Sequence, residues 1–381
     1  MYHFNKKDKI KGGKEMGTRV LHDENDHLEY NRKEFVYDKA TPGLSLGYNP
    51  NDGFYIGPSY TFTKYGFKKE PYKYQHKIAA NRTFGAGGYN VYYDFRRVQT
   101  IGPLDLHLQA KLNRPIVYQF YGKGNETIGL DDEIDSFNVR MNNLEIAPSL
   151  SYSFLRRTGT VKFGLDVRRV SFDETPSVSL QDWETKDQTF GGLSLGFESL
   201  VKNGNLNPSR GTHIKLSGAW HRGLSNSPIN FFRLATSLSL YVPLAIVKKQ
   251  TVLAVRTGFE RNFGTQAFFQ SNFLDGFVNF RGVRRNRYAG DACFYNNFEL
   301  RQSLFNLRTY AAPFDIGLLA HFDVGKVWET DISSSKFHKS VGAGAFITIL
   351  DYFMINGTYS VSNPNDSDEN NLLTIGTSFL F

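Results

Sequence analysis

Hydrophobic and polar residues alternate along most of the chain, from residue 41 to its end. In residues 104–112, for example, every second position is Leu or Ala, and the positions between them are polar or charged. A period of two is typical of a β-strand with one apolar face and one polar face. Because the pattern recurs segment after segment, the sequence predicts an all-β protein.

About sixteen segments alternate in this way, and an even number suits an antiparallel barrel whose two ends lie on one side of a membrane. The predicted strands are 41–49, 53–66, 72–84, 88–99, 103–113, 136–154, 159–172, 189–202, 211–223, 230–243, 250–263, 292–305, 314–328, 337–349, 351–362 and 371–381. Links on one side are mostly short, whereas the alternate links, such as 114–135 and 264–291, are long and polar. Short periplasmic turns and long outer loops are typical of outer-membrane barrels.

The predicted fold class is therefore a transmembrane antiparallel β-barrel of about 16 strands. A closed barrel leaves no strand edge in hydrocarbon, where each unpaired backbone group costs several kcal/mol. No run approaches the ~18 consecutive apolar residues of a spanning helix. The alternative is a soluble propeller or sandwich, which needs a conventional core and has little use for so many one-sided strands.

Composition narrows the function classes. The 33 Phe and 21 Tyr suit the aromatic girdles of a membrane barrel. The net charge is +8, but 45 basic residues are scattered among 37 acidic ones, so no nucleic-acid partner is predicted. A single cysteine, Cys293, excludes an internal disulfide and any zinc site built from cysteines. We predict no cofactor and no metal site.

Residues 1–40 are polar and mixed in charge, and we predict that they form a lead-in or linker before a barrel of residues 41–381. The first residues, Met1–Lys9, lack the apolar core of a secretory signal peptide. For an outer-membrane protein this leaves two interpretations: the chain is the C-terminal part of a longer precursor, which we expect, or its true start has been cut off.

The long link after the eleventh strand carries four arginines among apolar residues and glycines, at 274–291. One interpretation is a solvated basic loop. The other starts from the polar faces of the next two strands, which hold Glu299 and Asp323. If this loop, the sixth on the outer side, folds into the lumen, Arg281 can pair with those carboxylates, because a guanidinium binds a carboxylate bidentately and stays charged when shielded.

The sequence resembles the bacterial surface antigen superfamily of sixteen-stranded barrels, which includes the central subunit of the barrel-assembly machinery and the two-partner-secretion transporters. The resemblance covers roughly residues 41–381. It rests on the loop motif Phe280-Arg281-Gly282, Phe298-Glu299-Leu300-Arg301 in strand twelve, Phe322-Asp323-Val324-Gly325 in strand thirteen and the turn Asn207-Pro208-Ser209-Arg210-Gly211. It implies that Arg281 dips into the lumen and contacts Glu299 and Asp323.

Two departures from the family pattern are visible. Val283 stands where the family usually has an aromatic residue, and the residues before the barrel are too few for a periplasmic repeat domain. The segments Tyr48–Gly53 and Tyr121–Thr127 look like barrels of this superfamily that follow a phosphoesterase-type or patatin-like domain in one precursor. That likeness implies an enzymatic domain upstream of this chain, and we predict no catalytic residues within the barrel.

The last predicted strand ends in a pattern that looks like the C-terminal recognition signal of outer-membrane barrels. Its elements are Thr374, Gly376, Phe379 and Phe381, and Leu373, Ile375, Phe379 and Phe381 are predicted to share one apolar face. A simpler interpretation is a final strand that happens to end in apolar residues.

Enzymatic signals are poor, since the nine His show no His-x-x-x-His pair and no nucleophile elbow is present. We predict a non-enzymatic outer-membrane protein with a periplasmic N-terminus that acts in protein translocation or outer-membrane protein assembly, through a lumen-plugging loop and a seam between first and last strands. A passive anchor for an upstream hydrolase-type domain and a lipid-modifying enzyme are the alternatives. The expected partners are lipopolysaccharide or phospholipid, the barrel-assembly machinery for its own insertion, and a polypeptide client or upstream domain.

Overall fold

The computed structural model describes residues 36–49, 53–66, 69–85, 87–127, 137–155, 157–174, 180–204, 206–225, 227–245, 250–308, 313–350, 353–363 and 370–381. Lys39–Phe381 forms one compact unit. Among these residues, no helix is both long and apolar enough to traverse a lipid bilayer.

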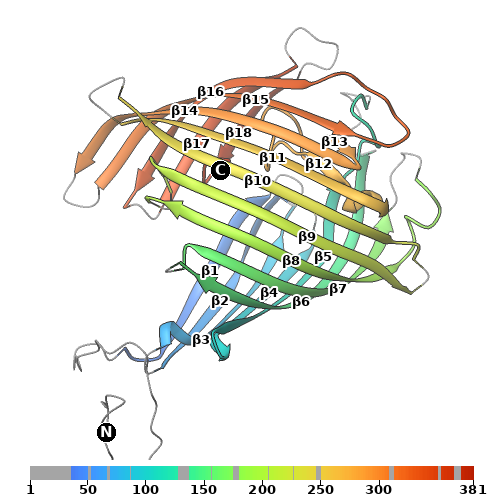
Figure 1. Cartoon of the computed structure of the whole chain (residues 1–381), viewed down its shortest axis with the longest axis horizontal. Helices are drawn as coiled ribbons and strands as arrows, with labels where there is room; N and C mark the ends of the chain where they lie inside the picture. Colours follow the sequence, from blue (N-terminus) through green and yellow to red (C-terminus); the bar gives the residue numbers. More distant parts are fainter. Residues whose placement is uncertain are drawn as a thin grey trace, which may run out of the picture. The chain divides into compact units, whose positions relative to one another are not determined.

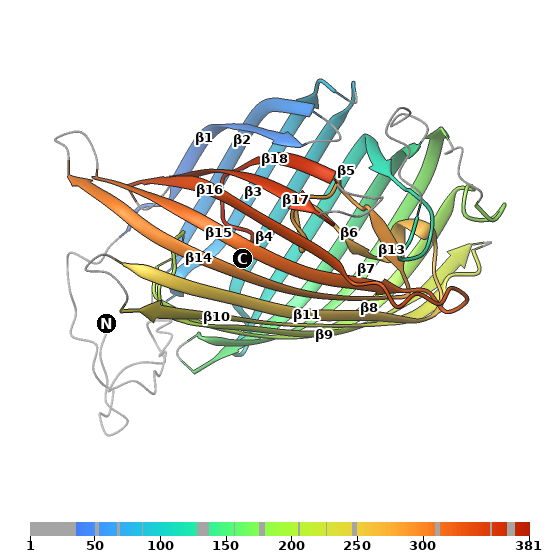
Figure 2. The same cartoon turned by 90° about the horizontal axis from the view of Figure 1, so that it is seen from above.

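Sixteen strands form one antiparallel sheet, in which each strand pairs with its neighbours in chain order (Figures 1 and 2). They are β1 (Lys39–Asn49), β2 (Gly53–Gly66), β3 (Lys69–Thr83), β4 (Tyr89–Ile101), β5 (Leu104–Gln119), β6 (Asn138–Phe154), β7 (Gly159–Glu174), β8 (Gln188–Lys202), β9 (Gly211–Ser225), β10 (Asn230–Leu244), β11 (Thr251–Thr265), β14 (Ala292–Arg308), β15 (Pro313–Trp328), β16 (His338–Ile349), β17 (Phe353–Ser362) and β18 (Asn370–Gly376). Each of the sixteen predicted strands has its counterpart here. The predicted all-β barrel fold is confirmed.

The two faces of the sheet differ as the alternation predicts. In β17, Phe353, Ile355 and Tyr359 are more than half exposed on the outer face, whereas Met354 and Ser360, at alternate positions, are buried. Apolar side chains that point away from a sheet this curved have no protein to pack against. Their exposure is what a lipid-facing surface requires.

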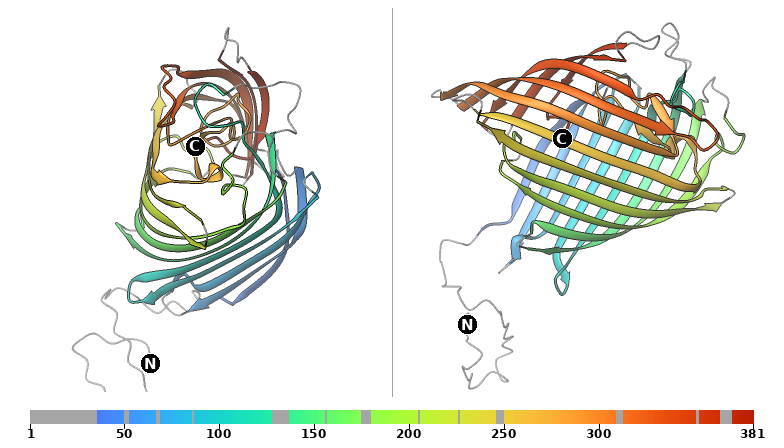
Figure 3. Two further views of the ribbon diagram at one scale, coloured as in Figure 1. Left: turned by 90° about the vertical axis from the view of Figure 1, so that its right-hand side faces the viewer. Right: turned by 45° about the horizontal axis from the view of Figure 1, so that its top comes forward.

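Three short elements in the connection between β11 and β14 were not predicted. They are η3 (Phe268–Gln270), β12 (Asn272–Leu274) and β13 (Tyr288–Gly290), and β12 pairs with β13 in a separate two-stranded sheet. Figure 3 (left) shows this gold and orange connection inside the ring of strands. We call residues 266–291 the lumen loop.

The ends of the large sheet are β1 and β18. β1 pairs with β2 and β18 pairs with β17, and within the described residues no ladder joins β1 to β18. β18 is also short, because its pairing with β17 stops at Gly376 opposite Asn356. Among the described residues, β1 and β18 are therefore the two end strands of the sheet.

The prediction of a last strand over residues 371–381 is wrong for residues 377–381, which lie outside β18. Leu373 and Ile375 are exposed on the outer face, but Phe379 is 7% exposed and packs against Phe346 and Leu319 of the inner wall. Phe381 stacks on Tyr241 of β10. After Gly376 the chain leaves the sheet and turns inward, because the rings of residues 379 and 381 find aromatic and cationic partners within the lumen.

Candidate functional site

The lumen loop is held in shape mainly by one aspartate. The backbone oxygen of Asp275 accepts hydrogen bonds from the amides of residues 278–280, and its carboxylate accepts from the amides of Phe277, at 2.8 Å, and Asn286, at 3.2 Å. The amide of Asp275 donates to Oδ1 of Asn279 at 2.9 Å. Burial raises the pKa of the Asp275 carboxyl, and the backbone amides that it accepts from oppose this shift. The Asp275 side chain thus supplies hydrogen bonds to backbone amides in a loop that has little regular structure of its own.

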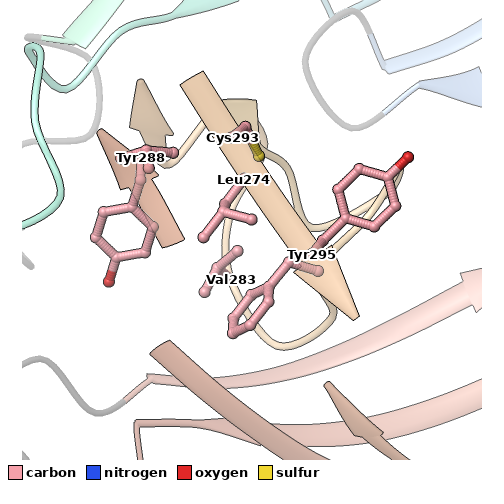
Figure 4. Packing of buried hydrophobic residues seen from close by; sticks show 7 residues of the cluster. Leu274, Val283, Tyr288, Cys293 and Tyr295 are labelled. Atoms are coloured by element: carbon pink, nitrogen blue, oxygen red, sulfur yellow. The ribbon is translucent and has the colours of Figure 1, made fainter. Parts of the chain in front are cut away.

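A small hydrophobic cluster fastens this folded loop to the wall (Figure 4). Leu274, Val283 and Tyr288 of the loop pack with Cys293 and Tyr295 of β14. Val283, at 1% exposed, fills the place where the superfamily resemblance suggested an aromatic side chain. The thiol of Cys293 is free and buried, and it lies 3.3 Å from the carbonyl oxygen of Phe273.

Arg281 projects from this loop to two carboxylates on neighbouring strands. Its Nε and Nη2 donate to Oδ2 and Oδ1 of Asp323, at 2.9 and 2.8 Å, and its backbone amide donates to Oδ2 at 3.1 Å. Its Nη1 donates to Oε2 of Glu299. The structure therefore brings together the three residues that the motifs singled out.

These three side chains are almost completely removed from solvent. The exposed fractions are 7% for Arg281, 1% for Glu299 and none for Asp323. Burial alone lowers the pKa of the Arg281 guanidinium, but its hydrogen bonds to Asp323 and the negative charges of Asp323 and Glu299 outweigh burial and raise it. The arginine stays charged, and a bidentate pair of this kind is strong because no water competes for its donors.

Gly282 explains why the motif pairs arginine with glycine. Its φ of +81° lies in the left-handed region. A Cβ at this position would lie 2.9 Å from Oγ of Ser340 and 3.1 Å from Cβ of Ser360. Its carbonyl oxygen accepts a 2.8 Å bond from Oγ of Ser362. The loop backbone can reach the inner faces of β16 and β17 only because residue 282 has no side chain.

Two further wall residues hold the loop, and the sequence did not reveal them. Arg256 of β11 donates from Nη2 to the carbonyl oxygen of Val278 at 2.9 Å, and Asn297 of β14 donates from Nδ2 to that of Asn279 at 2.9 Å. The acceptors are backbone carbonyls. Only their placement on the lumen face of a strand could have marked these donors in advance.

The connection between β5 and β6 closes over the same loop. Asn125, at 3% exposed, accepts from the amide of Val327 at 3.0 Å and donates to the carbonyl oxygen of Lys336 at 2.8 Å. Arg287 of the loop donates to Oγ1 and to the carbonyl oxygen of Thr127. Residues 121–127, which carry a family likeness in the sequence, thus cover this end of the lumen.

Several histidines have acidic partners that the sequence did not show. Nε2 of His107 lies 2.6 Å from Oδ2 of Asp94, and Nε2 of His213 lies 2.7 Å from Oε1 of Glu198.

His321 lies between Oγ of Ser360, at 2.8 Å, and Oδ2 of Asp323, at 3.6 Å. In space, the serine, histidine and aspartate follow one another as they do in a hydrolytic triad. Ser360 is fully buried, however, and Gly282 packs on it, while Asp323 is bound by Arg281. No substrate carbonyl can reach this serine while the loop is in place.

The remaining predicted residues lie apart from the Arg281 cluster. Asn207–Gly211 forms the turn into β9, where the side chain of Asn203 accepts from the amides of Ser209 and Arg210. Thr374 and Gly376 lie on β18, and Phe379 and Phe381 lie inside the lumen. In the part of the chain described, no group of three or more His, Cys, Asp or Glu side chains could hold a metal ion.

The fold and this loop define a class of protein. A sixteen-stranded antiparallel sheet, apolar outside and tied inside to a long loop, is the architecture of an outer-membrane β-barrel. The model of the Omp85 superfamily domain matches residues 77–351, which is more than half of the chain. The chain therefore belongs to the Omp85 superfamily and is an outer-membrane protein, and the resemblance to surface antigen barrels is confirmed.

Solved structures agree with this fold. The barrel is similar to BamA from Haemophilus ducreyi lacking POTRA domains 1–3, with a TM-score of 0.67 and 12% identity, covering 90% of this chain and 70% of that one. It is similar to CdiB from Escherichia coli, with a TM-score of 0.56 and 14% identity over 88% of this chain and 61% of that one. It is also similar to CdiB from Acinetobacter baumannii, with a TM-score of 0.54 and 11% identity over 90% of this chain and 60% of that one. The chain spans less than two thirds of either CdiB. No curated protein sequence matches it significantly.

Proposed function

We propose that this barrel acts in the translocation of polypeptides or in their assembly into the outer membrane. In this proposal, Arg281 pins the lumen loop across the channel, and the seam between β1 and β18 opens to pass or receive a client polypeptide. The N-terminal side of the barrel faces the periplasm, and the long connections face outward. The proposal is supported by membership of the Omp85 superfamily and by the similarity to BamA and CdiB.

The observation that carries the proposal is the buried contact of Arg281 with Glu299 and Asp323. Four hydrogen bonds join this one loop residue to two wall carboxylates and hold the loop in the position that a plug requires. The seam supplies the second element, because unpaired strand edges are the part of a barrel that can accept another strand. No catalytic role is included, since Ser360 lies beneath Gly282.

The test reconstitutes the full chain in liposomes and follows the folding of a urea-unfolded eight-stranded outer-membrane barrel added from outside. We expect the wild type to accelerate insertion and R281A to lose the acceleration. A cysteine crosslink between β1 and β18, in a Cys293→Ala background, should block the acceleration until reductant is added. Ion conductance across a planar bilayer should rise in R281A, because the loop no longer plugs the channel.

A passive anchor predicts no acceleration by the wild type and no effect of the crosslink. If R281A also kept normal folding, normal heat-modifiability and normal client insertion, the proposed mechanism would be wrong. Release of free fatty acid or lysolipid from the liposomes would instead support a lipid-modifying enzyme.

A further inference from the structure

The residues after β18 bind a well-defined site on the inner wall. The carbonyl oxygen of Leu380 accepts from Nη1 of Arg256 at 3.3 Å, and that of Phe381 accepts from Nη2 of Arg301 at 3.0 Å. The Phe379 ring lies 3.7 Å from the guanidinium carbon of Arg301. We call residues 377–381 the inner segment. The end of the chain, marked C in Figure 3, lies within the ring of strands.

The site is built and buried. Arg301 is 1% exposed, and its Nε donates to Oε1 of Glu299 at 2.6 Å, which fixes the guanidinium plane beneath the Phe379 ring. The rings of Phe346 and Phe379 meet edge-on with their centroids 5.1 Å apart. Arg256 lies 5.0 Å from the Phe381 ring. Aromatic rings over desolvated guanidinium groups gain cation–π attraction that they would lack in lipid.

One of these arginines also holds the lumen loop, and the other shares its carboxylate partner with the loop. Arg256 donates to the loop through Nη2 and to the inner segment through Nη1. Glu299 receives Arg281 of the loop on Oε2 and Arg301, which holds the inner segment, on Oε1. Loop and inner segment therefore share one donor and one acceptor, so each orders the side chains that the other needs.

A second position for the inner segment follows from the strand register. β18 ends with Gly376 opposite Asn356, so the first three residues of β17, Phe353–Ile355, have no partner on that side among the described strands. Residues 377–379 could extend β18 along them. The alternation would then turn Phe379 and Phe381 to the outer face with Leu373 and Ile375. Such an extension lengthens the edge that β1 can meet.

We propose that the inner segment is a latch that binds the site formed by Arg256, Arg301, Tyr241 and Phe346, and that the lumen loop and this latch stabilise each other. When the loop undocks from Arg256 and Glu299, the latch is released, extends β18 and closes the seam toward β1. The coupling itself stands on the contacts above, whereas its use in client passage rests on the proposed function.

The test places a photo-reactive p-benzoylphenylalanine at position 379 of the full chain in liposomes and maps its crosslinks by mass spectrometry. In the otherwise wild-type chain we expect crosslinks to β15–β17 residues of the inner wall. R281M removes the loop contact without touching the inner segment, and it should shift these crosslinks toward lipid or β1 by roughly fivefold or more. E299Q should act in the same direction with milder effect on folding.

Two controls define the result. R168M breaks another lumen pair, the partly exposed Arg168 with Glu145 at 3.1 Å, and should leave the crosslinks unchanged. A photo-reactive residue at position 375, which is 73% exposed, should label lipid in every variant.

Lipid labelling from position 379 in the wild-type background, or an unchanged crosslinking pattern in a correctly folded R281M, overturns the latch. If R281M loses client insertion but keeps the pattern, the coupling is wrong and the proposed function stands. If the pattern shifts while insertion is normal, the latch stands and the proposed function fails.

Discussion

Arg281 and Asp323 are 42 residues apart in the chain and joined by three hydrogen bonds, two from the guanidinium and one from the backbone amide. A single loop residue thereby fixes both its side chain and its main chain to β15. Because Asp323 is fully buried, neither partner can exchange the other for water.

Replacing Arg281 by Ala should undock the lumen loop. The change leaves Glu299 and Asp323 buried without their cation, and breaking a buried pair in this way costs about 3–5 kcal/mol. Hydrogen exchange of the loop amides should rise accordingly, and the electrophoretic shift between folded and heated barrel should appear at a lower temperature.

The matched control is R285A, four residues further along the same loop. Arg285 is one third exposed, and its Nε lies 3.8 Å from Asp275, so its loss should cost less than about 1 kcal/mol. Equal exchange rates in R281A and R285A would contradict a special role for Arg281.

Gly282→Ala should loosen the loop by two separable effects. A left-handed φ costs a residue with a Cβ about 1 kcal/mol, and the new methyl group must also displace Ser340 and Ser360. Gly102→Ala is the control, because Gly102 has a φ of +57° and nothing lies within 4 Å of a Cβ there. Loop hydrogen exchange and heat-modifiability should change in G282A by clearly more than in G102A. Equal effects would show that only backbone strain matters.

The strands and the Arg281 cluster were accessible from sequence for different reasons. A period of two persists in all sixteen strands because one face meets lipid throughout, and this constraint acts on every residue. The family resemblance pointed to Arg281, Glu299 and Asp323, because each is a charged residue within a short motif and the resemblance implies that the three are in contact. Their contacts follow from the register of β14 and β15, which places Asn297 opposite Asp323 and Glu299 opposite His321.

Other parts of the site left no comparable trace. β12 and β13 have three residues each, too few to show a period. Arg256 and Asn297 bind backbone carbonyls, which every residue offers. The inner segment continues the alternation of β18, so its pattern is equally compatible with a longer strand. Its inward turn depends on Arg301 and Phe346, which belong to strands distant in sequence.

Asn125→Asp should open the cover formed by the connection between β5 and β6. The amide nitrogen of Asn125 donates to the carbonyl oxygen of Lys336 and to Oγ of Ser334, and a carboxylate oxygen in its place would face the carbonyl without a proton. A buried polar group left without its partner costs about 1–3 kcal/mol. Hydrogen exchange of residues 123–127 and 336–339 should rise. Ser334→Ala removes one of these contacts together with the Ser334 hydrogen bonds to Glu126 and to the Lys336 amide, so it should raise the exchange of the same segments. If the exchange of these residues were unchanged in N125D, contacts other than those of Asn125 would hold the cover in place.

Glu329, just beyond β15, should make the same end of the barrel sensitive to pH. Burial, followed by the negative charge of Asp291, raises the pKa of Glu329 from 4.5 to about 7, while Lys123 opposes the shift. A carboxyl whose pKa is higher in the folded state is most stabilising when protonated, so the contribution is complete below pH 4.5 and is lost as pH rises to about 7. Glu329 is partly exposed, and solvent screening reduces the effect to about 1 kcal/mol.

The backbone amides of residues 329–332 should therefore be less protected from hydrogen exchange at pH 8 than at pH 5, after correction for the intrinsic pH dependence of exchange. Glu329→Gln stays neutral at both pH values and should remove this difference, whereas Asp331→Asn, next in the same connection but a minor contributor to the shift, should largely keep it. A pH response that persists in E329Q would assign the sensitivity to another group.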